Sequence, residues 1–249
     1  MTVFKTIIVI QARLGSSRLP GKVLLPLGGH PVLWHVIERC RRSSEAQAVV
    51  VATTTNVLDD VIEAWCQQQG YFVYRGDEEN VLSRYVTLAS QTKSEIVVRV
   101  TADCPLVDPV TIDRVVRTLQ TSDYDYVHVK AEEKYPDALP RGLNVEAFRS
   151  QTLWRLEERA SLPRHREHVT LLVEEDPTFR LLRLPAPEGL ARPHYRLTLD
   201  TPADFIMLQR LFVKGTVGPE TTLEEIIAFL DRHPEIASIN NSVKQKEII

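Results

Sequence analysis

Apolar strands and amphipathic helices alternate along the first 120 residues, and this alternation limits the possible folds more than any other feature of the sequence. Continuous apolar runs at residues 6–10, 48–53 and 95–100 are typical of strands buried on both faces. Between them, apolar residues recur at helical spacing over residues 31–42 and 56–70. This order predicts an α/β fold with a mixed, mostly parallel sheet, right-handed crossovers and helices on both faces.

Short polar residues mark two helix starts. Asp108 and Pro109 predict the cap and the first residue of a helix after the strand at 95–100. Asn56 predicts a cap for the helix that ends near Gly70. In that helix, the side chains expected to face the core are Val57, Val61, Ala64 and Trp65.

The pattern is less regular in the second half of the chain. It predicts strands at 124–129, 142–148 and 179–184, a polar loop at 130–141, and helices near 151–159 and 166–175. We interpret residues 124–196 as an insertion within a single domain of residues 1–249. Residues 194–200 are expected to return to the sheet as a strand, and the tail at 240–249 is expected to fray.

Bulk composition excludes several classes of function. A net charge of −3 provides no general attraction to nucleic acid or to a membrane surface. No apolar run approaches the ~20 residues that a membrane span needs. Three cysteines without C-x-x-C spacing indicate neither a zinc site nor a disulfide framework. We therefore expect a cytoplasmic protein that binds neither nucleic acid nor membrane.

The loop after the first strand carries unusual chemistry. Gly15 and Ser16 allow backbone N–H groups to approach an oxyanion, and Arg13, Arg18 and Lys22 add positive charge. A loop that only reverses the chain needs none of these cations, although a basic surface loop is the simple alternative. The combination predicts a site for a polyphosphate.

This loop is not a Walker A motif. Gly15 and Gly21 have five residues between them, where Walker A has four, and Lys22 is followed by Val23, which has no hydroxyl group for a metal ion. The chain also lacks a G-x-G-x-x-G fingerprint for dinucleotides at this position.

Two aspartates follow apolar segments that are expected to end at the same edge of the sheet. Asp103 comes directly after the strand at 95–100, and Asp200 ends the segment 194–200. Ligands bind outside the carboxyl ends of strands in such folds, so both carboxylates should face the polyphosphate loop and hold Mg²⁺. Thr201, Pro202 and Asp204 predict the start of the next helix, which explains Asp204 without a metal.

Five blocks of sequence carry a family resemblance: QARLGSSRLPGKVL, RVTADCPLVDP, PRGLNVEAF, REHVT and LTLDTPADF. In this order they resemble the cytidylyltransferases of spore-coat polysaccharide biosynthesis (the SpsF type), which are relatives of the acylneuraminate and 3-deoxy-octulosonate cytidylyltransferases. The resemblance implies a nucleotide-diphospho-sugar transferase fold of the GT-A-like, Rossmann-like kind. It also implies transfer of CMP from CTP to an acidic sugar or related acceptor, with Mg²⁺ as cofactor, pyrophosphate as product and a homodimer that involves residues 124–196.

The resemblance and the residue chemistry together assign roles to individual residues. Catalysis is assigned to Arg13, Lys22, Asp103 and Asp200, with the two aspartates as metal ligands. Nucleotide binding is assigned to Ala12, Arg13, Gly15, Ser16, Arg18, Lys22, Arg75, Arg99 and Asp103. Acceptor binding is assigned to Arg141, Asn144, Glu146, His165 and His168.

Some of these residues have competing interpretations. His165 and His168 have the spacing of a metal-binding pair, face a dimer partner, or simply begin a solvated helix. Arg141 is either an anchor for an anionic acceptor or a loop cation. Arg99 comes from a strand expected to be buried, which favours a carboxylate or a ligand as its partner.

One position departs from the family pattern. The block R-G-L-D-V-E of the family reads R-G-L-N-V-E here, so Asn144 replaces an aspartate and removes a charge. This change predicts an altered acceptor preference or reduced activity, and it keeps a non-catalytic nucleotide-binding subunit as an alternative. A sugar-nucleotide glycosyltransferase is the other alternative, but its D-x-D motif would have to be Asp123 and Asp125, which are better explained as a turn.

Overall fold

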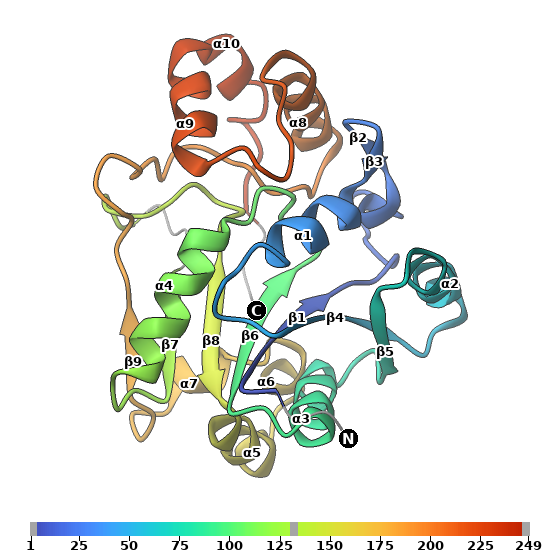
Figure 1. The fold of residues 1–249 in the computed structure, drawn as a ribbon, viewed down its shortest axis with the longest axis vertical. Helices are drawn as coiled ribbons and strands as arrows, with labels where there is room; N and C mark the ends of the chain where they lie inside the picture. The colour runs from blue at the N-terminus through green and yellow to red at the C-terminus, as the bar shows by residue number, and fades with distance from the viewer. Residues whose placement is uncertain (1–3, 130–133, 246–249) are drawn as a thin grey trace.

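The computed structural model describes residues 4–129 and 134–245. Within these ranges a seven-stranded sheet forms the centre of the molecule (Figure 1). Its strands, in spatial order, are β5 (Phe72–Gly76), β4 (Ala48–Thr54), β1 (Thr6–Gln11), β6 (Ile96–Thr101), β8 (Val145–Arg149), β7 (Tyr126–Val129) and β9 (Leu181–Arg183). A small separate hairpin joins β2 (Pro26–Leu27) to β3 (His30–Pro31).

Strand direction matches the predicted mixed, mostly parallel sheet. Strands β5, β4, β1 and β6 pair in parallel, as expected for strands linked by crossover helices. Strand β8 is antiparallel to both β6 and β7, and β9 is parallel to β7. The less regular part of the chain, residues 124–196, therefore extends the same sheet.

Helices cover both faces of the sheet (Figure 1). The α-helices are α1 (Val32–Cys40), α2 (Asp60–Gln69), α3 (Val81–Thr92), α4 (Pro109–Gln120), α5 (Ser150–Arg159), α6 (Pro163–Glu167), α7 (Leu171–Glu175), α8 (Pro202–Lys214), α9 (Leu223–Arg232) and α10 (Pro234–Ala237). Two short 3₁₀ turns, η1 (Lys22–Leu24) and η2 (Val57–Asp59), precede α1 and α2.

Two hydrophobic cores are present among the described residues, and β1 contributes alternate residues to each of them. Ile8 and Ile10 pack with α1, α2, α4 and the C-terminal helices, whereas Ile7 and Val9 pack with α3 and α5. All four side chains are fully buried, which explains the continuous apolar run in the sequence. The predicted caps at Asp108 and Thr201 are also confirmed, because their side chains accept hydrogen bonds from the amides of Thr111 and Asp204.

The prediction for the inward face of α2 was mostly wrong. Asn56 does accept a hydrogen bond from Leu58 N, but residues 57–59 form the 3₁₀ turn η2 and not the first α-turn. A 3₁₀ turn has fewer residues per turn, so the helical phase shifts. Ile62 and Cys66 face the core, while Val57 and Val61 are 73% and 55% exposed.

Two further predictions were wrong in the C-terminal half. Residues 194–200 form no strand and make one isolated bridge, between Arg141 and Arg196, since they cross the sheet edge and pair with that loop. Gly142 permits this close approach: at its φ of +100°, a Cβ atom would lie 2.4 Å from Thr198 N. The helix expected at 166–175 is divided into α6 and α7.

The predicted frayed tail begins with an anchored residue, because Asn240 is fully buried, whereas Asn241, Ser242, Lys244 and Gln245 are exposed. The side-chain nitrogen of Asn240 donates to the carbonyl oxygen of Arg196 at 2.9 Å and to Asp204 Oδ1 at 2.8 Å. Residues 246–249 of the predicted frayed tail, and residues 130–133 of the predicted polar loop, lie outside the described residues.

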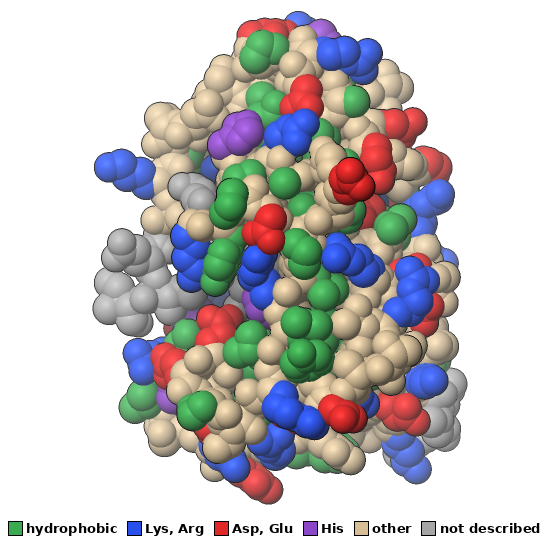
Figure 2. Space-filling model, turned by 90° about the vertical axis from the view of Figure 1, so that its left-hand side faces the viewer, with side chains coloured by type: hydrophobic (Ala, Val, Ile, Leu, Met, Phe, Trp, Pro, Cys, Tyr) green, Lys and Arg blue, Asp and Glu red, His purple; other side chains and the backbone are tan. Residues whose placement is uncertain are grey.

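Surface charge is mixed in sign. On the face shown in Figure 2, acidic and basic side chains are interspersed with apolar ones. Among residues 4–129 and 134–245, no helix is both long enough and apolar enough to cross a bilayer.

Candidate active site

Hydrogen bonds to the backbone of Leu14 fix the conformation of the loop between β1 and η1. The carbonyl oxygen of Leu14 accepts hydrogen bonds from Ser16 N at 2.7 Å and Gly21 N at 3.1 Å, and Leu14 N donates to Asp59 Oδ1 at 2.7 Å. Gly21 has a φ of +70°, and this left-handed turn leads directly into the 3₁₀ turn that begins at Lys22. The loop therefore presents Lys22 at a fixed place above the sheet edge.

Asp103 lies in the loop that leaves β6. Its Oδ1 atom accepts a hydrogen bond of 2.7 Å from the hydroxyl group of Thr101, the last residue of that strand, and a longer one of 3.6 Å from Cys104 Sγ. Burial raises the pKa of the Cys104 thiol, so this side chain is a neutral neighbour of the carboxylate.

Asp200 lies immediately before α8. The capping box of α8 fixes the backbone here, since Thr201 and Asp204 bond reciprocally and Asp200 N also donates to Asp204 Oδ2 at 3.0 Å. The Leu199 amide donates to the carbonyl oxygen of Asp103 at 2.8 Å, which brings the two aspartate-bearing segments together.

Lys22 bridges the two aspartates. Its Nζ atom lies 2.6 Å from Asp103 Oδ2 and 2.8 Å from Asp200 Oδ1, and Arg18 Nη2 lies 3.0 Å from the same Asp200 oxygen. Burial lowers the pKa of Lys22, but the two carboxylates together outweigh burial and raise this pKa above its ordinary value. Burial raises the pKa of Asp103, and the charge and hydrogen bonds of Lys22, Thr101 and Cys104 together bring it below its usual range. Lys22 and Asp103 are thus both ionised at neutral pH.

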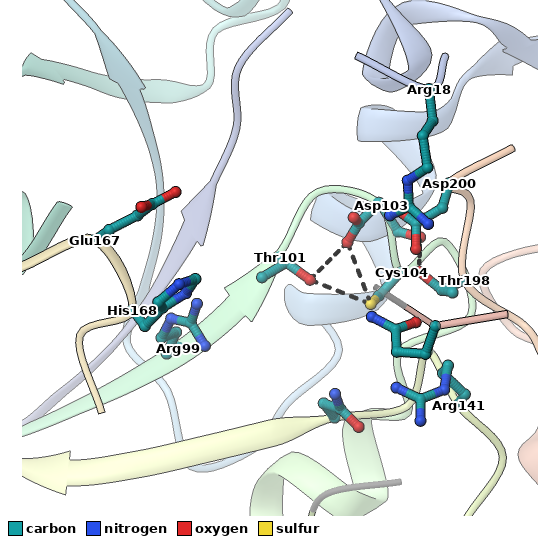
Figure 3. Close-up of a pocket in the computed structure, with 13 residues that line it drawn as sticks. Arg18, Arg99, Thr101, Asp103, Cys104, Arg141, Glu167, His168, Thr198 and Asp200 are labelled. Carbon is teal, nitrogen blue, oxygen red and sulfur yellow. Dashed lines mark hydrogen bonds and ion pairs between the residues drawn. The ribbon is translucent and has the colours of Figure 1, made fainter. Parts of the chain in front are cut away.

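Two adjoining cavities meet at this cluster. The smaller, about 290 Å³, is lined mainly by the first loop, and the larger, about 500 Å³, is lined mainly by residues of the second half of the chain (Figure 3). Arg18, Thr101, Asp103 and Asp200 line both cavities. A group in one cavity can therefore meet a group in the other beside the two carboxylates.

The larger cavity is rich in cationic and polar side chains. In addition to the four shared residues, its lining consists of Arg99, Cys104, Arg141, Gly142, Asn144, Glu167, His168, Thr198 and Gln245. Arg99 is held by Glu146, with Nη1 and Oε2 2.8 Å apart, and Glu146 is only 4% exposed. Burial lowers the pKa of His168, so its imidazole is neutral at pH 7.

Most of the predicted site residues are gathered here. Arg13, Gly15, Ser16, Arg18 and Lys22 line the smaller cavity with Asp103 and Asp200. Arg99, Arg141, Asn144 and His168 line the larger one. Glu146 reaches it through Arg99.

Three predicted residues are placed elsewhere. Ala12 is buried at the end of β1, where its amide donates to Ala52 O, and it lines neither cavity. Arg75 forms ion pairs with Asp60 and Glu63 at 2.6 and 2.9 Å and lines neither cavity.

The third is His165, which is buried with Nε2 2.9 Å from Glu175 Oε2, away from the cavity that His168 lines. The two histidines therefore do not act as a pair in this site.

Sequence reasoning missed several residues of the site. Gln11 and Thr101 end their strands at this edge, and that position was a usable signal. Gln245 belongs to a tail that showed no apolar pattern, so no signal pointed to it. Arg196, which contacts Asp200, is the one charged residue of the segment RLTL and could have been suspected from that.

The donor set suits a hard divalent cation. The Lys22 ammonium lies between the two carboxylates, so this position already accommodates a cation between them. Among the described residues, no group of three or more His, Cys, Asp or Glu side chains is arranged to hold a metal ion. Magnesium fits such a site because it commonly takes one or two carboxylates and completes its shell with water and substrate phosphate oxygens.

A mostly parallel sheet, a cationic Gly/Ser loop after β1 and two carboxylates at the same edge are the features of an α/β nucleotidyltransferase fold. The chain belongs to the cytidylyltransferase family, whose model matches residues 7–247. This confirms the family predicted from the sequence.

Known proteins resemble the chain over nearly its whole length. The spore coat polysaccharide biosynthesis protein SpsF of Bacillus subtilis is 37% identical over 237 residues, which cover 92% of this chain and 95% of that protein. The structure of a cytidylyltransferase from Leptospira borgpetersenii superposes with a TM-score of 0.86 at 30% identity and covers 98% of this chain and 99% of its own. The fold is shared with CMP:2-keto-3-deoxy-manno-octonic acid synthetase in complex with CTP, at a TM-score of 0.62, 21% identity, and 84% and 99% coverage.

Proposed function

We propose that this protein transfers CMP from CTP to an anionic acceptor, an acidic sugar or a related molecule, with release of pyrophosphate and with Mg²⁺ as cofactor. The observation that carries the proposal is the Lys22 bridge between Asp103 and Asp200 at the junction of two cavities. Family membership supports CTP as the nucleotide.

The smaller cavity suits the triphosphate. Arg13, Arg18 and Lys22 supply positive charge, and the small residues Gly15 and Ser16 let the backbone approach phosphate oxygens. On this assignment Lys22 and Arg13 stabilise the charge that develops on the leaving pyrophosphate. When bound by Asp103 and Asp200, Mg²⁺ supplies positive charge that neutralises phosphate oxygens.

The larger cavity suits the acceptor. Arg99 and Arg141 favour an anionic molecule there, and Asn144 offers an amide for a hydrogen bond. An acceptor oxygen attacks the α-phosphorus of CTP in line, while the bond from that phosphorus to the oxygen shared with the β-phosphate breaks. A carboxylate or phosphate acceptor needs no general base because its oxygen is already ionised. Alignment and charge neutralisation are then the main contributions of the protein.

The glycosyltransferase alternative receives no support from Asp123-Tyr124-Asp125. Asp125 pairs with Arg155 at 3.0 Å and accepts the amide of Arg180 at 2.8 Å. Because Asp125 precedes β7, which runs in the direction of β6, it lies at the opposite end of the sheet from Asp103. Asp125 therefore holds Arg155 and the backbone of Arg180 at that end of the sheet.

Homodimer formation through residues 124–196 and a cytoplasmic location remain predictions. The exposed apolar side chains of Trp154, Leu162 and Leu181 in that segment favour a protein contact there.

Thermal stabilisation by nucleotides tests the proposed function. With CTP and Mg²⁺ at about 100 times Kd, we expect the folded state to gain about 2.7 kcal/mol, with a smaller gain from UTP, ATP and GTP. Pyrophosphate release should then depend on both CTP and an acidic sugar. Stabilisation by a sugar nucleotide alone would favour a glycosyltransferase, and no stabilisation by any nucleotide would favour a non-catalytic subunit.

Replacement of Asn144 by aspartate tests the acceptor assignment. The change restores the aspartate of the family pattern beside Arg99 and Arg141 and alters the charge that the acceptor meets, so we expect KM for the acceptor to change about tenfold while KM for CTP stays the same. Steady-state pyrophosphate release measures both constants, and Asn241→Asp, an exposed change near the C-terminus, is the control. If the Asn144→Asp variant and the wild type have the same KM for the acceptor, Asn144 does not contact the acceptor.

A further inference from the structure

Arg196 is a buried arginine that contacts Asp200 through the carboxylate oxygen that Lys22 and Arg18 do not contact. It is 7% exposed, and its guanidinium forms two ion pairs: Nη2 with Asp200 Oδ2 and Nε with Asp204 Oδ1, each 2.9 Å long. A buried ion pair of this kind needs fixed geometry, because both charges have lost their water.

The surroundings hold this guanidinium in one place. Asp204 is fully buried and belongs to the capping box of α8, so its carboxylate is fixed by the helix itself. Asn240 donates to Asp204 Oδ1 at 2.8 Å and to the carbonyl oxygen of Arg196 at 2.9 Å. The start of α8 and the segment after α10 therefore fix both ends of Arg196.

In this arrangement the two carboxylate oxygens of Asp200 have different partners. Arg196 takes Oδ2, while Oδ1 faces Lys22 at 2.8 Å and Arg18 at 3.0 Å. The carboxylate consequently cannot turn without breaking an ion pair, and only one of its oxygens is directed to the cations of the phosphate loop.

We propose that Arg196 is a positioning residue that sets the orientation of Asp200 for the metal–nucleotide complex, and that Gln245 links the C-terminal segment to this function. The inference rests on the proposed function, since it assumes that Asp200 meets a metal ion and CTP. Gln245 Oε1 accepts a hydrogen bond of 3.0 Å from Arg196 Nη1, and Gln245 also lines the larger cavity. The residues that follow α10 thereby belong to the active site. Partners that orient a metal ligand commonly contribute ~10–100-fold to metal affinity.

The test is Mn²⁺ binding in the presence of saturating CTP, followed by electron paramagnetic resonance, which does not depend on turnover. Arg196→Lys keeps the charge but cannot reach three partners, and we expect about tenfold weaker Mn²⁺ binding. The double variant Arg196→Gln/Asp204→Asn removes both buried charges together, so that no unpaired carboxylate remains in the core, and should weaken binding about 100-fold. Gln245→Ala, at the surface, should weaken it about fivefold.

Arg192→Gln is the matched control, because it removes an exposed arginine–aspartate pair with Asp231 in the same stretch of chain. It should bind Mn²⁺ and CTP like the wild type. Wild-type Mn²⁺ affinity in both Arg196→Lys and the folded double variant would overturn the inference and leave the proposed function intact. Failure of the wild-type protein itself to bind Mn²⁺ with CTP would overturn the proposed function, and this inference with it.

Discussion

Replacing Asp103 with asparagine is expected to lower kcat for CMP transfer by at least ~10³-fold, and Asp200→Asn should do the same. Each change keeps the shape of the side chain and an oxygen that accepts a hydrogen bond. Each change removes one of the two negative charges that contact Lys22 Nζ, which lies 2.6 Å from Asp103 Oδ2 and 2.8 Å from Asp200 Oδ1. On the proposed assignment, that charge is also half of the protein's metal ligation.

Pyrophosphate release at saturating CTP, Mg²⁺ and acceptor measures this effect. Asp231→Asn is the control, because Asp231 forms an ion pair with Arg192 outside both cavities. Circular dichroism should show that both site variants remain folded. Turnover within tenfold of the wild type in either folded site variant would contradict the metal assignment.

Replacing Lys22 with methionine is expected to weaken CTP binding about 100-fold, since a charge-assisted phosphate contact is lost while the side chain keeps a similar length. The same change removes the counter-ion that joins Asp103 to Asp200, which are both largely buried. We therefore expect a lower melting midpoint in the absence of metal and a larger rise on addition of Mg²⁺ alone than in the wild type.

Calorimetric titration with CTP and melting curves with and without Mg²⁺ give the two readouts for Lys22→Met. Lys214→Met, an exposed lysine at the end of α8, serves as the control. Unchanged CTP affinity would refute the phosphate-loop assignment. An unchanged response to Mg²⁺ would show that the Lys22 bridge does not occupy the metal position.

Much of the fold was predictable because burial on both faces produces continuous apolar runs. The runs around Ile8 and Val98 are strands for this reason. The segment around Leu197 and Leu199 has the alternation of a strand, yet Arg196, Thr198 and Asp200 are buried as well, because the chain crosses the sheet edge and pairs with Arg141. Ion pairs and hydrogen bonds bury the polar side chains of this segment, and alternation along the sequence does not reveal such partners.

The site was predictable to the extent that topology determines it. Parallel strands end at one edge, so Lys22 and Asp103 were expected to meet, and they do at 2.6 Å. Arg75 also lies near the end of a strand, β5, but two carboxylates on α2 hold its guanidinium away from the cavities. Such a choice of partner depends on side-chain direction in three dimensions, which spacing along the chain does not encode. The same limitation hid Gln245.

The Lys22 bridge has a consequence for the order in which ligands arrive. Lys22, Arg18 and Arg196 already balance the charges of Asp103, Asp200 and Asp204, so an isolated divalent ion finds little uncompensated negative charge. A triphosphate offers Lys22 and Arg18 new partners and frees the aspartates at the same moment. On the proposed function, metal and nucleotide therefore enter as one complex, and the resting enzyme resists occupation by the other divalent ions in its surroundings.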